Sequence, residues 1–262
     1  MPIKTTGSPA DDTEDDGQTK PFMEHLEDLR RTIIRAAMAF AVGMCIAIPA
    51  APWILYILKL PLKWAGKDPS TFLQVLEVTG GLSLATQTVF WAGLLISAPF
   101  IIYFIWEFVF PGLTKREQGA ITSSIGFALV LFILGVLTGY YLALAPGIKV
   151  MIWFSDWMGV NVTFFRATDY IRFVVILLLS FGICFELPII LLILGQMGLV
   201  TSRQLRDKRS VAIVVVLIIA AVVTPTTDPF TQLVMAVPMC LLYELCIWIL
   251  WSKERKAAKE ST

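Results

Sequence analysis

The sequence predicts an all-α, polytopic membrane protein with six transmembrane helices, and three observations support that prediction. Hydrophobic residues make up 57% of the 262 positions, while charged residues make up only 16%. A soluble domain of this size needs far more charge to cover its surface. The apolar residues stand in long blocks of membrane-spanning length, and the basic residues are unevenly divided between the segments that join those blocks.

Composition divides the chain into three parts. Residues 1–19 are acidic and rich in Gly, Ser and Thr, which is typical of a disordered tail. Residues 20–251 hold the six predicted spans, and residues 252–262 form a basic cytoplasmic tail. The first apolar run begins only after Arg35, so we expect no cleavable signal peptide.

The first span is predicted over 33–48, where Pro49 and Pro52 end or kink it. It follows an amphipathic stretch, 22–30, whose apolar residues recur at helical spacing. We expect this stretch to lie along the membrane surface before the chain turns inward.

Five further apolar blocks predict the remaining spans at 84–110, 120–145, 170–194, 211–223 and 233–251. The second and third blocks stop at Pro-Gly pairs. The fifth and sixth spans are predicted to be short, and at 1.5 Å per residue the fifth reaches roughly 20 Å against a hydrocarbon core of about 30 Å. The connections at 54–83 and 146–169 are rich in Trp, Pro and apolar residues, which predicts structured outer loops.

Lysine and arginine predict the orientation. With the N-terminus placed inside, the inner segments hold 15 of the 21 basic residues and the outer segments hold 6. Short cytoplasmic loops carry this excess in membrane proteins. The predicted topology is therefore N-in and C-in.

Several kinds of site are disfavoured. The four cysteines lie in apolar blocks without metal-binding spacing, and His25 is the only histidine. A membrane-embedded enzyme is therefore disfavoured, and we expect no metal and no cofactor. The chain also lacks a basic stripe with interleaved aromatics, so we expect no nucleic-acid partner.

Glu186 is the most informative single residue, because it lies deep in the predicted fourth span. A carboxylate there costs roughly 2.5–3.5 kcal/mol on insertion scales. Pro188 adds polarity, since it leaves the carbonyl of Cys184 without its intrahelical donor. Two interpretations stay open: a protonated glutamate that closes an interhelical hydrogen bond, and a functional site.

Other polar residues carry weaker indications. Asp28 precedes the first span and Glu117 lies in the predicted loop after the second, and either could be a solvated charge at a helix end. Glu244, in the sixth span, is expected to pair with a basic group. Gly135 and Gly139 form a GxxxG motif, which favours close helix packing.

The chain resembles the TatC family. The string His-Leu-Glu-Asp-Leu-Arg-Arg at 25–31 is similar to the family's opening motif His-Leu-x-Glu-Leu-Arg, and Phe-Glu-Leu-Pro at 185–188 is similar to its Phe-Glu-x-Pro. Further matches in the same order are Ser-Ala-Pro at 97–99, Trp-Glu-Phe-Val-Phe-Pro-Gly-Leu at 106–113, Lys-Arg-Glu at 115–117, Thr-Pro at 224–225 followed by Asp228, and the segment from Pro238 to Glu244.

The resemblance implies a receptor and core component of the twin-arginine translocase, which binds the signal peptides of folded export cargo. It implies that Asp28 and Glu117 receive the arginine pair, with Phe108 and Arg30 in the same signal-peptide site. Asp28 departs from the glutamate usual in the family, which shortens the side chain by one methylene.

The resemblance also implies partners and a location. Glu186 corresponds to the family's intramembrane glutamate, and it stands with Pro188 and Glu244 as a partner contact or intramembrane polar group. Implied partners are single-span TatA and TatB type subunits, further copies of the chain, and the lipid bilayer. Transport is expected to depend on the proton-motive force, in the plasma (inner) membrane of a bacterium rather than a thylakoid.

One alternative function is a proton-coupled small-molecule or ion transporter that uses Glu186 as the proton carrier. The chain shows no internal repeat and few other intramembrane charges that could form a relay, which disfavours it.

Overall fold

The structure is a computed structural model that describes residues 22–109, 115–196, 200–223 and 229–260. Its long helices are α1 (Phe22–Trp64), α3 (Gly80–Val109), α4 (Lys115–Thr138), α5 (Leu144–Trp157), α6 (Ala167–Cys184), α9 (Arg209–Val223) and α10 (Pro229–Glu260). Shorter elements are α2 (Pro69–Phe72), β1 (Leu73–Gln74), the π-helix η1 (Gly139–Ala143), β2 (Phe165–Arg166), α7 (Leu187–Gln196) and α8 (Ser202–Asp207).

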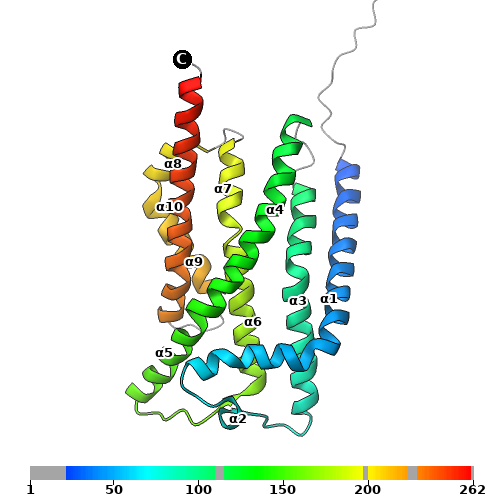
Figure 1. Ribbon diagram of the computed structural model, residues 1–262, viewed down its shortest axis with the longest axis vertical. Helices are drawn as coiled ribbons and strands as arrows, with labels where there is room; N and C mark the ends of the chain where they lie inside the picture. Colours follow the sequence, from blue (N-terminus) through cyan, green and yellow to red (C-terminus); the bar gives the residue numbers. More distant parts are fainter. Residues whose placement is uncertain (1–21, 110–114, 197–199, 224–228, 261–262) are drawn as a thin grey trace, which may run out of the picture.

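The helices form an elongated bundle (Figure 1). The start of α1, the ends of α3 and α10, and α8 lie at one end, which we call the terminal end. The opposite end, which we call the cap end, carries α2 and the last turns of α5. The bundle is built around α6, where Ile171, Val174 and Val175 are fully buried.

Within the described residues, five helical segments are long and apolar enough to cross a membrane. They are His25–Trp64, Gly80–Phe108, Gly126–Trp157, Ala167–Gly195 and Gln232–Lys256. The predicted fifth span is the shorter apolar helix α9, which has 15 residues. The predicted sixth span is not short: α10 has 32 residues and continues helically through most of the predicted basic tail.

The prolines after the first span bend α1 but do not end it. The helix continues through Pro49, Pro52 and Pro61, and its later part, residues 50–64, runs across the bundle (Figure 1). We call residues 50–64 the crosswise segment. The expectation that 22–30 lies along the surface before a turn is wrong, because α1 shows no turn between 22–30 and the predicted span.

Two tyrosine hydroxyls hold the crosswise segment. Pro61 has no N–H, so the carbonyl of Ile57 lacks its usual intrahelical donor. The hydroxyl of Tyr140, from η1, donates to that carbonyl at 2.7 Å. The hydroxyl of Tyr170, from α6, donates to the carbonyl of Leu58 at 2.9 Å. A buried carbonyl freed by proline is thus satisfied by a neighbouring helix.

The third predicted span does not stop at Pro146, because α5 continues to Trp157. The π-helix η1 comes just before, and the N–H of Leu144 bonds five residues back to the carbonyl of Gly139. Pro146 then falls in the first turn of α5, where a missing N–H costs little. Because the change of helical pitch in η1 comes just before Pro146, the chain can continue as a helix past this proline.

The GxxxG motif is confirmed as a close-packing site. A Cβ at Gly135 would lie 2.6 Å from the carbonyl oxygen of Phe181, and one at Gly139 would lie 3.0 Å from the Phe181 ring. The absence of side chains at these two positions therefore lets α4 and η1 approach the backbone of α6.

Replacing Gly135 with valine should destabilise the fold by about 1–3 kcal/mol, the usual range for overpacking a tight contact. Gly126→Val, in the same helix, is the matched control because a Cβ there meets nothing within 4 Å. Thermal unfolding in detergent should show a lower midpoint for Gly135→Val only. Equal midpoints for the two variants would contradict the close approach of α4 to α6.

The two predicted structured loops are confirmed. The crosswise segment, α2 and β1 occupy the first, while α5 and β2 occupy the second. Strands β1 and β2 pair in parallel, with Leu73 opposite Phe165, and Arg166 forms an ion pair with Glu77 at 3.4 Å. The loops therefore fold against each other at the cap end.

Candidate signal-peptide site and intramembrane carboxylate

The start of α1 and the end of α3 meet at the terminal end. The His25 ring stacks on the Phe108 ring, with centroids 4.6 Å apart and planes inclined by 25°. Further along α1, Arg35 Nη1 lies 3.2 Å from both carboxylate oxygens of Glu107. These contacts join the two helices, and His25, Glu107 and Phe108 belong to the predicted motifs.

Asp28 lies between these contacts on α1. His25, Asp28 and Arg35 are separated by three and seven residues, which places them on one helical face. Since His25 and Arg35 both contact α3, that face points toward the end of α3. Asp28 is half-buried there, and its backbone carbonyl accepts a hydrogen bond from Thr32 at 2.9 Å.

Other charges surround Asp28. Glu27 pairs with Arg31 at 2.8 Å across one helical turn, and both side chains are well exposed. Arg30 is exposed as well. A carboxylate at a half-buried position is less screened by solvent than one on an open surface, so its attraction for a cation is stronger.

Glu117 is the other predicted acidic member of this site. The structure places it in the first turn of α4, so the prediction of a loop position is wrong. In Figure 1 the start of α4 lies at the terminal end, with the start of α1 and the end of α3. The prediction that Asp28 and Glu117 together receive an arginine pair stays a prediction, because the Glu117 side chain lies outside the part of the chain that the structure describes.

Glu186 separates α6 from α7. Its backbone N–H bonds to the carbonyl of Ile183, and its own carbonyl accepts from the N–H of Ile189 at 3.1 Å. The proline two residues on cannot donate to the carbonyl of Cys184, as predicted, and the regular helix breaks there. The Pro188 carbonyl faces the thiol of Cys246 in α10 at 3.7 Å.

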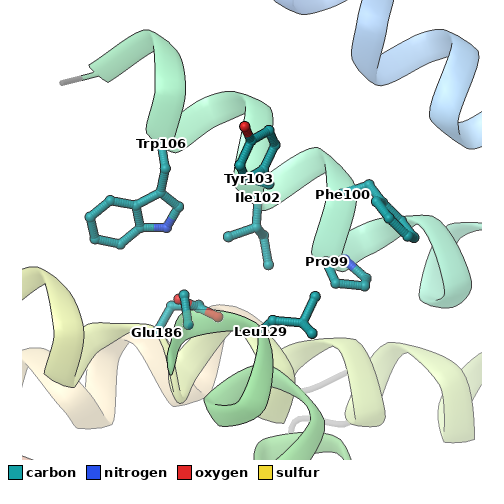
Figure 2. A pocket seen from close by; sticks show the side chains of 8 residues that line it. Pro99, Phe100, Ile102, Tyr103, Trp106, Leu129 and Glu186 are labelled. Atoms are coloured by element: carbon teal, nitrogen blue, oxygen red, sulfur yellow. The ribbon is translucent and has the colours of Figure 1, made fainter. Parts of the chain in front are cut away.

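The Glu186 side chain faces a cavity of about 290 Å³ between α3, α4 and the α6–α7 break. Figure 2 shows its carboxylate opposite a row of α3 side chains that includes Pro99, Tyr103 and Trp106. Glu186 is 5% exposed. Neither carboxylate oxygen has a hydrogen-bond partner within the part of the chain that the structure describes.

A buried carboxylate that faces an apolar cavity needs a hydrogen-bond donor. Lipid tails cannot donate a hydrogen bond, so a donor must come from protein or water. The cavity borders three elements of the bundle, and a polar side chain from an additional helix could reach the carboxylate there. This geometry favours a functional group over an interhelical hydrogen bond within the described residues.

Glu244 in α10 pairs with a basic group, as predicted. Its Oε2 lies 2.6 Å from Nη2 of Arg209, the first residue of α9. Neighbouring Tyr243 donates from its hydroxyl to the carbonyl of Leu205 in α8, at 2.8 Å. Glu244 therefore ties α10 to the start of α9, in a cluster separate from the Glu186 cavity.

The family of this chain is decided by comparison with known proteins. The family described as "Sec-independent protein translocase protein (TatC)" matches residues 24–238. The chain belongs to the TatC family. It is a component of the Sec-independent protein translocase and works with other Tat subunits.

Individual TatC proteins show the same similarity. The Deinococcus radiodurans protein is 36% identical over 231 residues, which cover 86% of this chain and 83% of that protein. The Aquifex aeolicus protein is 33% identical over 229 residues, covering 87% and 94%. A crystal structure of the twin-arginine translocase receptor TatC in the detergent DDM is 33% identical, with a TM-score of 0.74, and covers 86% of this chain and 99% of that one.

Sequence reasoning missed two features of the TatC site. One is the Arg35–Glu107 ion pair, although Glu107 lies within a predicted motif and Arg35 follows another by four residues. The other is the α3 wall opposite Glu186. Its residues Pro99, Tyr103 and Trp106 stand at i, i+4 and i+7, one face of a helix, and that spacing could have indicated a shared surface.

Proposed function

We propose that this TatC-family chain is the receptor that binds the paired arginines of a signal peptide at the terminal end. Asp28 provides the main support, because it is half-buried on the face of α1 that points toward Phe108 and the end of α3. A guanidinium pairs with a carboxylate through charge-assisted hydrogen bonds, which are stronger than those between neutral groups. Glu117, at the start of α4, supplies the second carboxylate.

The proposed topology has six spans with both termini in the cytoplasm. The described start of α1 and the end of α10 lie at the same end of the bundle (Figure 1), which supports an even number of crossings. In the described part of the chain five segments reach spanning length, so α9 supplies the sixth. Because α9 is short, it requires local thinning of the bilayer or shelter behind other helices.

The wider proposal covers partners and energy supply. The chain acts with TatA and TatB type subunits and with further copies of itself in a bacterial inner membrane. It uses no cofactor, and the proton-motive force drives the transport of folded cargo. A proton-coupled small-molecule transporter fits the structure less well, because Tyr103 is the only titratable residue beside Glu186 among the described residues that line the cavity.

Peptide selectivity tests the receptor proposal. The chain in nanodiscs should bind an arginine-pair signal peptide, and a lysine-pair peptide should bind about tenfold more weakly, because an ammonium cannot match a carboxylate in the bidentate geometry. Raised salt should weaken the binding of both peptides. Fluorescence anisotropy with labelled peptides measures this, and equal affinity for the two would contradict the proposal.

A further inference from the structure

The crosswise segment of α1 is amphipathic. Leu58, Pro61 and Leu62 are buried against the bundle, while Trp53 and Tyr56 are 67% and 58% exposed. An amphipathic helix with exposed aromatic and basic residues is typical of one that lies in the membrane interface. This segment is therefore built to rest on a bilayer with one face against protein.

Its direction agrees with an interfacial position. The spanning helices run along the length of the bundle, and the crosswise segment runs across them at the cap end (Figure 1). A segment across the spanning direction lies parallel to the membrane plane. Trp and Tyr are enriched at the level of the lipid headgroups. The exposed Trp53 and Tyr56 therefore indicate that the crosswise segment lies at that level.

A groove of about 350 Å³ lies between the crosswise segment and the start of α2. Lys59 and Lys63, one helical turn apart, line one side, and Asp68 and Ser70 line the other. Its volume lies within the range of small-molecule sites, about 300–1,000 Å³. The groove therefore lies at the level of the lipid headgroups and is large enough to hold one headgroup.

The charged side chains of the groove suit a ligand that carries both a negative and a positive group. Within the described residues, neither lysine forms an ion pair. Asp68 accepts hydrogen bonds from the N–H of Ser70 at 3.0 Å and from its hydroxyl at 2.8 Å. These bonds hold the pKa of the Asp68 carboxyl below its usual value, so the groove presents two ammonium groups and one fixed carboxylate.

We propose that this groove binds the headgroup of an amine-bearing phospholipid from the leaflet at the cap end. Lys59 and Lys63 bind the phosphate, and the carboxylate of Asp68 binds the headgroup ammonium. A purely anionic headgroup would leave Asp68 facing another negative charge. The proposal is independent of the receptor function, because the groove and the arginine site lie at opposite ends of the bundle.

Native mass spectrometry of the delipidated full chain, titrated with defined lipids, tests this site. The parent should retain phosphatidylethanolamine about tenfold better than phosphatidylglycerol. The double variant Lys59→Gln with Lys63→Gln should lose about tenfold or more of this binding, since each basic residue at a membrane surface contributes measurably to lipid attraction. Asp68→Asn should keep lipid binding but lose the preference for ethanolamine.

Lys67→Gln is the matched control, because Lys67 is a cap-end lysine that lies over the Phe72 ring, 5.2 Å from its centroid, and does not line the groove. Circular dichroism checks that all variants fold. The proposal is overturned if Lys67→Gln lowers lipid binding as much as the double variant does. It is equally overturned if the parent binds both lipids alike, or if inorganic phosphate competes as well as the lipid does.

Discussion

Replacing both Asp28 and Glu117 with alanine should weaken the binding of an arginine-pair signal peptide by about tenfold to a hundredfold. A hydrogen bond to a charged group contributes about 1.5–3 kcal/mol, and a factor of ten in affinity corresponds to about 1.4 kcal/mol. The loss should be larger than for either single variant. Titration of the labelled peptide against each variant in nanodiscs measures it.

Glu27→Ala is the matched control for this effect. Glu27 is an acidic residue of the same helix turn, and its well-exposed side chain pairs with Arg31. Such exposed pairs contribute little, so this variant should bind the peptide nearly as the parent does. A double alanine variant with parental affinity would show that the arginine pair binds elsewhere.

Replacing Glu186 with alanine should reduce co-purification of single-span partner subunits by roughly tenfold, whereas Glu186→Gln should keep most of it. Interhelical hydrogen bonds in membranes contribute up to about 1–2 kcal/mol. Glutamine keeps the side-chain volume and can still hydrogen-bond, but it cannot ionise. If Glu186 is a docking group, the Glu186→Gln variant should therefore keep its function. If Glu186 carries protons, the same variant should lose it.

Leu129→Ala separates the polar contact from the shape of the cavity. Leu129 lines the same cavity and carries no polar group, so its truncation enlarges the cavity without removing a hydrogen bond. We expect partner co-purification and export close to the parental values. A Glu186→Gln variant that assembles normally and yet exports nothing would contradict docking and favour the proton-carrier hypothesis.

The sequence predicted the helical bundle well because the apolar blocks are long. Four of the six blocks became helical segments close to their predicted limits at one end or both. Glu244 forms the expected ion pair with a basic residue, Arg209, because a charged side chain within a membrane span is stabilised by pairing. The GxxxG motif was also informative, because the position of glycine on a helix already indicates where a backbone can approach.

The prolines were harder to interpret. Pro49 was predicted to end or kink the first span, and α1 bends and continues. Pro146 was expected to stop the third span, and α5 runs through it. At Pro146 the outcome depends on helical pitch, because η1 changes the hydrogen-bond pattern just before it. At Pro61, further along α1, it depends on tertiary structure, because Tyr140 supplies a donor to the freed carbonyl of Ile57.

The surroundings of Glu186 also could not be predicted from its own segment. Its depth in the fourth span could be predicted from the apolar block around it, but the two interpretations differed in what the side chain faces. That depends on how α3 crosses α6, which places Trp106 and Pro99 around the cavity. The length of α10 was underestimated because its last turns are polar and are held by α8, where the N–H of Ser202 donates to Glu254 at 2.9 Å.

Site-specific crosslinking tests the receptor account most directly. A photoreactive residue is placed at position 28, at position 117 or, as the cap-end control, at position 70, and each variant is mixed in nanodiscs with an arginine-pair signal peptide. Both faces of the bilayer are open to the peptide in this system. The account predicts strong crosslinks from 28 and 117 that an excess of unlabelled arginine-pair peptide removes, with none from 70. Crosslinks from position 70 as strong as those from position 28, or none from 28 and 117, would contradict it.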